Sequence, residues 1–169
     1  IMQFADFALR LGMALIFGAA IGFERQRRQR MAGISTNALV CIGSCIFVML
    51  GLLTPHEVSP TRIAAQVVTG IGFLGAGVIM RDGLNVRGMN TAATMWCVAA
   101  VGTLTGMGFL LHAGLGVIAI LSANVLLRPV ARMINAKPML MEDTEVRYFF
   151  RTVWRADGEA NVRAMILHA

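Results

Sequence analysis

The stretch GMNTAATMWCVAAVGTLTGMGFLLHAGLGVIAILSANVLL, residues 88–127, runs for forty residues without an Asp, Glu, Lys or Arg. One helix that crosses a bilayer needs about 20 apolar residues, so this stretch has the length of two such helices. Gly106, Gly108 and His112 cluster within residues 105–114, where a tight turn is expected. The sequence therefore predicts two adjacent membrane helices joined by a short turn.

The rest of the chain repeats this pattern of apolar stretches between charged ones. Hydrophobic residues make up 57% of the 169 residues and charged residues only 14%, whereas soluble domains carry about 25% charged residues. The expected spans are 4–23, 33–53, 63–80, 90–107 and 110–127. We therefore expect an all-α transmembrane fold, a five-helix bundle within residues 1–130, in which Asp6 and Arg10 can pair on one helical face.

Basic residues follow the first, third and fifth spans far more often than the second and fourth. Nine of them lie on one side of the expected membrane, and only Arg10 and Arg62 lie on the other. The positive-inside rule places the richer side in the cytoplasm, so the N-terminus is expected outside and the C-terminal segment inside. The net charge of +6 then reports orientation in the inner membrane, and nucleic acid is not an expected partner.

Residues 138–169 are polar and mixed in charge, unlike the chain before them. Alternating side chains predict a strand at about 146–155, and a helix is expected at about 159–167. One strand and one helix are too little for a core of their own. This segment is therefore expected to begin a small cytoplasmic α/β domain.

The third span contains GIGFLG, residues 70–75, which matches the dinucleotide-binding pattern G-x-G-x-x-G. That pattern has meaning after a strand and with an acidic residue about 20 positions later, where this chain has Met95. Packing explains the small residues better, because they let membrane helices approach closely. We expect the third span to be a central, tightly packed helix that uses Ala65, Thr69, Gly70, Gly72, Gly75, Ala76 and Gly77.

Polar residues gather at those ends of the spans that the expected topology places in the cytoplasm. The predicted cytoplasmic polar cluster consists of Glu24, Arg25, Gln26, Arg28, Asn37, Arg81, Asp82, Arg87, Asn90, Thr91 and Trp96. A carboxylate at the hydrocarbon edge needs a cationic partner, so Glu24 is expected to be held inward by one of three arginines: Arg28, Arg81 and Arg87. Trp96 lies deeper than an interfacial belt favours and is expected to pack inside the bundle.

Simpler interpretations of the same residues stay open. The arginines after the first span can serve only to orient the chain in the membrane. Glu24 can point to water beside a surface arginine. Asn90 and Thr91 can serve only as caps of the fourth helix. The three cysteines, Cys41, Cys45 and Cys97, are expected to be packing residues, and the sequence predicts no catalytic residue, cofactor or metal site.

Two long signatures in this chain resemble the bacterial MgtC/SapB family, and within it the MgtC branch. They are GFERQRRQRMAG at 22–33 with STNALV after it, and RIAAQVVTGIGFLGAGVIMRDGLNVRGMNTAATMWCVAAVG at 62–102. The likeness covers about residues 15–130. The matching motif positions are Glu24, Arg25, Gln26, Arg28, Asn37, Gly72, Gly75, Gly77, Arg81, Arg87, Asn90, Thr91 and Trp96.

The resemblance implies a virulence-associated inner-membrane protein with five spans and a C-terminal cytoplasmic α/β domain. It implies support of growth at low magnesium and of survival inside macrophages, without magnesium transport. It also implies an action on membrane energetics, with the F-type ATP synthase as a suggested target and small membrane peptides as regulators.

The leading expectation is a non-enzymatic regulatory protein that lies in the lipid bilayer and binds another membrane protein, or a second copy of itself. One alternative is a transporter or channel for Mg²⁺ or another small solute. No acidic residue is centrally placed in a span, which argues against a conventional ion carrier. A second alternative is a membrane enzyme that uses Glu24, Asp82 and Arg87.

Overall fold

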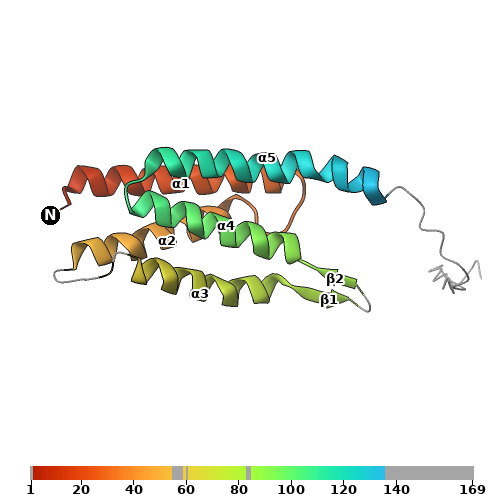
Figure 1. Cartoon of the computed structure of the whole chain (residues 1–169), viewed down its shortest axis with the longest axis horizontal. Helices are drawn as coiled ribbons and strands as arrows, with labels where there is room; N and C mark the ends of the chain where they lie inside the picture. The colour runs from red at the N-terminus through yellow and green to blue at the C-terminus, as the bar shows by residue number, and fades with distance from the viewer. Residues whose placement is uncertain (1, 55–58, 60, 83–84, 136–169) are drawn as a thin grey trace, which may run out of the picture. The chain divides into compact units, whose positions relative to one another are not determined.

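Five helices and a short β-hairpin form the part of the chain that the computed structural model describes, residues 2–54, 59, 61–82 and 85–135. Figure 1 shows the helices lying side by side along one long axis. In chain order the elements are α1 (Phe4–Arg27), α2 (Ile34–Leu53), α3 (Arg62–Val78), β1 (Met80–Asp82), β2 (Asn85–Arg87), α4 (Met89–Gly106) and α5 (Leu110–Asn135). The prediction of five helices is confirmed.

Helix α2 packs between α1 and α4 through two pairs of glycines. Gly18 and Gly22 are four residues apart on α1, and Gly102 and Gly106 are four apart on α4. A Cβ atom at Gly22 would lie 2.5 Å from the Cα of Ile34, and one at Gly106 would lie 2.7 Å from the carbonyl oxygen of Cys45. The backbones therefore approach as closely as small-xxx-small motifs allow in lipid.

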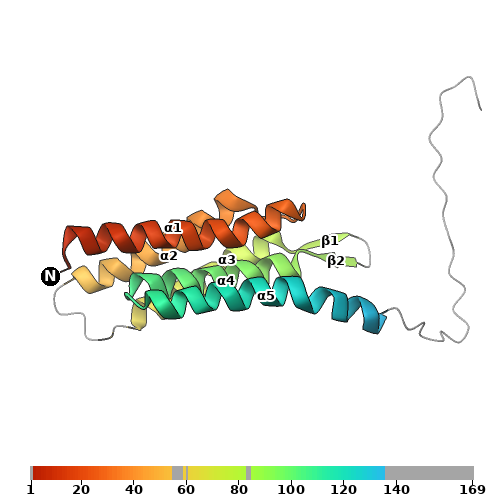
Figure 2. The ribbon, with the colours of Figure 1, turned by 90° about the horizontal axis from the view of Figure 1, so that it is seen from above.

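The centre of the bundle is an apolar core drawn from α1, α2, α4 and α5. Figure 2 shows α5 running beside α4 in the view from above. The buried core residues are Ala14, Ile21, Cys41, Cys45, Met49, Val98, Val101, Ala113 and Val117. Cys41 and Cys45 are buried and unpaired, as expected for packing residues, and Cys97 is half-buried.

Within the described residues, three helices have the length and apolar composition of membrane spans: α1, α2 and the Leu110–Leu127 part of α5. Helix α3 is apolar but shorter, with 17 residues. Helix α4 lies inside the bundle, and nine of its residues are buried. Helices of this kind identify a membrane protein, whereas the number of crossings and their direction stay predictions.

Helix α3 lies at the edge of the bundle, and the prediction that it is the central, tightly packed helix is wrong. Only Ile71 and Gly75 of this helix are buried, and Gly75 faces Ala92 of α4. A Cβ atom at Gly70, Gly72 or Gly77 would meet no atom of the structure within 4 Å. Close helix contacts are made by α1 and α4 against α2 instead.

A two-stranded hairpin connects α3 to α4. Strands β1 and β2 pair antiparallel, with Arg81 opposite Val86. Gly88 then begins α4 with a left-handed backbone, φ +93°, and its Cβ position is occupied by the carbonyl group of Val78. Only glycine fits there, because it has no side chain and tolerates positive φ.

The chain divides into two compact units, Ile1–Ile134 and Asn135–Ala169. The strand and helix expected within 138–169 lie outside the described residues.

Candidate functional site

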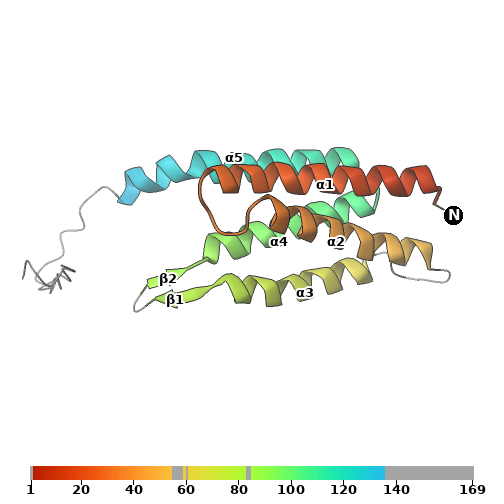
Figure 3. The same ribbon diagram turned by 180° about the vertical axis from the view of Figure 1, so that it is seen from behind.

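The end of α1, the start of α2 and the start of α4 meet at one end of the bundle. Figure 3 shows the connection between α1 and α2 folding back beside the first turns of α4. Arg25 lies at the centre of this junction and is fully buried. We call the group formed by Arg25, Asn37, Thr91, Thr94 and the backbone of residues 31–33 the Arg25 junction.

The guanidinium of Arg25 links three segments of the chain through hydrogen bonds. Its Nη1 donates to Thr94 Oγ1 at 3.0 Å, and its Nη2 donates to Thr91 Oγ1 at 2.7 Å. The same Nη2 and the Nε donate to the carbonyl oxygen of Met31 at 2.8 and 3.2 Å. Arginine holds several N–H donors in one rigid, planar fork, which lysine does not. An arginine can therefore bind three segments of the chain at once.

The two threonines are placed to receive this fork. Thr91 and Thr94 are three residues apart, so they share one face of α4. The hydroxyl of Thr94 donates its own proton to the carbonyl oxygen of Asn90 at 2.8 Å, which leaves its oxygen free to accept from Arg25. A buried cation needs such oxygen partners, because water does not reach it.

The α1–α2 connection is held in a strained backbone. Gln29 and Ala32 are not glycines, yet both have positive φ, 52° and 58°. Each such residue costs on the order of 1–3 kcal/mol and persists where surrounding contacts fix it. The bonds from Arg25 to the carbonyl oxygens of Met31 and Ala32 supply those contacts.

Asn37, on α2, also binds backbone carbonyl oxygens of the α1–α2 connection. Its Nδ2 donates to the oxygens of Ala32 and Gly33, at 2.7 and 2.8 Å, and its side chain is fully buried. Its Oδ1 is a buried acceptor without a hydrogen-bond partner within the described part of the chain. Leaving such an atom unpaired costs about 1–3 kcal/mol, which offsets part of the stabilisation from the two bonds that Asn37 donates.

Gln26 caps helix α2 from the preceding helix. Its Oε1 accepts from the backbone N–H of Ile34 at 3.1 Å. The N-cap residue of α2 is Gly33, which has no side chain to do so. The first N–H groups of a helix need acceptors, and Gln26 supplies one of them.

Glu24 is largely buried and pairs with the next turn of its own helix. Its side chain is 13% exposed, and Arg28 Nε lies 2.6 Å from Oε1. No aligned hydrogen bond reaches either carboxylate oxygen from the described residues, so the contact is an ion pair. Arg28 is 37% exposed, and the pair joins two turns of one helix, so it links no second element to α1.

The structure therefore divides the predicted polar cluster. Arg25, Asn37 and Thr91 meet at the Arg25 junction, Gln26 caps α2 beside it, and the Glu24–Arg28 pair lies on the last turn of α1. Four other predicted residues are exposed: Arg81, Arg87, Asn90 and Trp96. The side chain of Asp82 and residues 83–84 lie outside what the structure describes.

Two of the simpler interpretations and one expectation about these residues are wrong. Arg25 is a buried joint between helices, so orienting the chain is not its whole role. Thr91 does not cap α4, since the N-cap residue is Gly88 and α4 begins at Met89. Trp96 is 51% exposed because it lies on the side of α4 opposite Thr91 and Val98, not inside the bundle. Thr94 was missed as a site residue, although its i,i+3 spacing from Thr91 was a usable signal.

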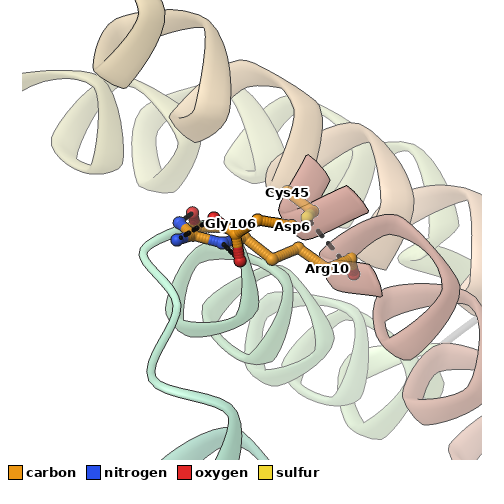
Figure 4. Close-up of polar contacts among 4 residues, drawn as sticks. All are labelled: Asp6, Arg10, Cys45 and Gly106. Carbon is orange, nitrogen blue, oxygen red and sulfur yellow. Dashed lines mark hydrogen bonds and ion pairs between the residues drawn. The ribbon is translucent and has the colours of Figure 1, made fainter. Parts of the chain in front are cut away.

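A second polar group ties α1 to α4 at the opposite end of the bundle (Figure 4). Arg10 pairs with Asp6 through two contacts of 3.1 and 2.6 Å, as its i,i+4 spacing predicts. Its Nη1 donates to the carbonyl oxygen of Gly106 at 2.7 Å, and its own carbonyl oxygen accepts from the Cys45 thiol at 3.8 Å. Gly108, with φ +88°, turns the chain toward α5 directly over this guanidinium.

Replacing Arg10 with alanine is expected to lower the free energy of unfolding by about 1.5–3 kcal/mol, because it leaves the Gly106 carbonyl without its charged donor. The loss is measurable by thermal unfolding in detergent. Asp6→Asn is the matched control, because it removes an ion pair whose carboxylate is 40% exposed. An equal loss in both variants would assign the stabilisation to the ion pair and not to the bond across the helices.

Chemically, the Arg25 junction is a positioning device. The donors of Arg25 and Asn37 are used in contacts within the chain, and the described residues contain no group of three His, Cys, Asp or Glu side chains that could hold a metal ion. The junction fixes how α1, α2 and α4 are arranged at one end of the bundle.

Comparison with known proteins gives a consistent family assignment. A family model described as the MgtC family matches residues 11–133. An uncharacterised protein of Synechocystis is 52% identical over 98% of this chain and 71% of its own length. Proteins named MgtC from Salmonella typhi and Brucella abortus are 51% and 47% identical, over 99% and 96% of this chain and 71% and 68% of theirs. No solved structure matches.

Proposed function

The chain belongs to the MgtC family, and from that premise we propose that it is a non-enzymatic regulatory protein of the bacterial inner membrane that binds another membrane protein through α3. The process it supports would be growth at low magnesium and survival inside macrophages, through an effect on membrane energetics. The F-type ATP synthase is the first partner to test, and a small membrane peptide is the second.

The uncovered outer face of α3 carries this proposal. Ala65, Thr69, Gly72 and Ala76 recur on one side of the helix, and all four are exposed. Nothing within 4 Å would meet a Cβ atom at Gly72. In lipid a face of small residues gains by receiving another helix, because backbones can then pack closely. The close contacts among α1, α2 and α4 do not involve that face of α3.

The apolar middle of the bundle supports this function over the transporter or channel for Mg²⁺ or another small solute. A solute path needs polar groups spaced through the membrane depth. Between the Arg10 and Arg25 groups the core residues are apolar, among them Ile21, Cys41 and Val98. The buried hydroxyls of Ser44 and Thr105 donate to carbonyl groups of their own helices.

The Arg25 junction has the role of holding the bundle in the form that the partner recognises. We place it on the cytoplasmic side, in keeping with five crossings, an outer N-terminus and a cytoplasmic C-terminus. The arginines that follow Glu24 support this direction, since the cytoplasmic ends of membrane helices are rich in arginine and lysine.

Replacing Gly72 with leucine is expected to abolish growth at low magnesium in a strain that depends on this protein, while its level in the membrane stays unchanged. The new side chain has open space within the chain, so only an external helix would meet it. Complementation of a deletion strain, with quantification of the membrane protein, makes the measurement.

Gly12→Leu is the matched control, because Gly12 on α1 also has open space around its Cβ position. Photo-crosslinking from position 76 in native membranes then identifies the partner by mass spectrometry. Full growth of the Gly72 variant, together with crosslinks to lipid alone, would contradict binding through α3.

A further inference from the structure

A groove of about 530 Å³ lies between α2 and α3, within the size range of about 300–1,000 Å³ that ligand pockets occupy. Its walls are mostly apolar. From α2 they consist of Leu39, Val40, Gly43, Ser44 and Phe47, and from α3 of Ile63, Gln66, Val67, Gly70, Ile71 and Leu74. Neither of the polar clusters described above contributes to it.

Two glycines keep the groove open. Gly43 on α2 and Gly70 on α3 belong to opposite walls, and a Cβ atom at either position would meet nothing within 4 Å. The two helices meet closely where the side chain of Ile63 contacts the position of a Cβ atom at Gly51. Several wall residues are exposed, among them Leu39, Phe47 and Leu74, so the groove opens to the surroundings and hydrocarbon of the bilayer can enter it.

The length of the groove fits one lipid chain. The α3 wall runs from Ile63 to Leu74, which at about 1.5 Å per residue is about 17 Å. Half of a hydrocarbon core about 30 Å thick is about 15 Å, the depth that one acyl chain fills in its leaflet. A partner helix, in contrast, needs a broad face, and α3 offers that on its other side.

One end of the groove is polar. The Gln66 side chain belongs to the lining and makes no hydrogen bond within the described part of the chain. An unpaired amide in hydrocarbon costs several kcal/mol, so an ester carbonyl or phosphate oxygen beside it is favoured. Arg62 begins α3 one turn before Gln66, and the first N–H groups of a helix attract phosphate.

We propose that this groove is a binding site for one membrane glycerophospholipid. An acyl chain lies along the groove past Gly43 and Gly70, the ester region accepts a hydrogen bond from the Gln66 amide, and the phosphate lies at the Arg62 end. The site is separate from the outer face of α3, so both faces of this helix can be occupied together.

Native mass spectrometry of the full chain tests the site, with delipidated protein in mild detergent and added palmitoyl-oleoyl phosphatidylglycerol as the probe. One lipid should bind to the native protein. Gly70→Leu and Gly43→Leu should weaken that binding by about tenfold or more, because they fill the space of several methylene groups. Gln66→Leu should weaken it about fivefold through the lost hydrogen bond.

Gly72→Leu is the control, because it adds the same side chain to α3 outside the groove and should leave lipid binding unchanged. Thermal unfolding of each variant verifies that it is folded. Equal lipid binding by all variants, or an equal loss with Gly72→Leu, would overturn the proposal. It would also be overturned if Gly70→Leu abolished a dimer of the chain and left lipid binding intact, because the occupant would then be a helix.

Discussion

Replacing Arg25 with methionine is expected to lower the free energy of unfolding by about 3 kcal/mol or more, because several buried acceptors lose their donor at about 1–3 kcal/mol each. Methionine has a similar length but no donors, so the hydroxyls of Thr91 and Thr94 and the carbonyl of Met31 lose their partner. The strained α1–α2 connection loses its support in the same step. Unfolding by SDS in mixed micelles measures the change.

Arg27→Met is the control for this variant, because it removes the same charge from an exposed position two residues away on α1. Its effect should stay within about 0.5 kcal/mol. Arg25→Lys should recover only part of the loss, because an ammonium group cannot reproduce the fork. Equal stability of the Arg25 and Arg27 variants would mean that the junction does not hold the helices together.

The second large effect is expected at Gly102, where leucine should prevent folding and alanine should cost about 1–3 kcal/mol. A Cβ atom here would fall on the carbonyl oxygen of Cys41 and would lie 2.9 Å from the Cβ of Ser44. The obstacle is backbone, which cannot rotate away as a flexible side chain can. Helix α4 would have to move off α2, and the central packing of the bundle would be lost.

The yield of monodisperse protein from membranes, with thermal unfolding of what is recovered, measures this effect. Gly77→Leu is the control, since its surroundings on α3 are open. Similar yields of the two leucine variants would contradict the assignment of the close helix contacts to α1, α2 and α4. A loss at Gly77 alone would restore the central role that the sequence predicts for the third span.

The helices themselves were predictable because charge and apolar length decide where a membrane helix can lie. Both ends of α2 were placed within one residue, since Gly33 and Thr54 flank a run without charged residues. Helix α5 continues to Asn135, past Arg128 and Pro129, because charged residues end an apolar span without ending a helix. The hairpin after α3 was missed, since strands of three residues leave no periodicity to detect.

The packing partners of the helices were harder to predict. GIGFLGAG is the most conspicuous run of small residues in the chain, yet close backbone contacts fall to pairs of glycines four apart on α1 and α4. Small residues allow another helix to approach closely, but they do not show which helix does so. The choice between a contact within the chain and one with a partner depends on all the other helices at once.

The sequence predicted several residues of the polar site, but it did not predict which contacts they make. Glu24 drew attention as a carboxylate at the hydrocarbon edge, whereas its neighbour Arg25 makes the contacts between helices. Arg25 follows Ala14, Gly18 and Ile21 at spacings of 4, 3 and 4, so it continues the buried face of α1. That spacing was a usable signal, because a charge on a buried face must find partners.

A double-mutant cycle between Arg25 and Thr91 tests the central claim most directly. Arg25→Met, Thr91→Val and the double variant would be unfolded in the same mixed micelles, and their free energies compared with that of the native protein. A charged hydrogen bond between buried groups predicts a coupling free energy of about 1.5–3 kcal/mol, with the double variant losing less than the sum of the single losses. Additive losses, with a coupling near zero, would contradict a joint between α1 and α4 built on Arg25.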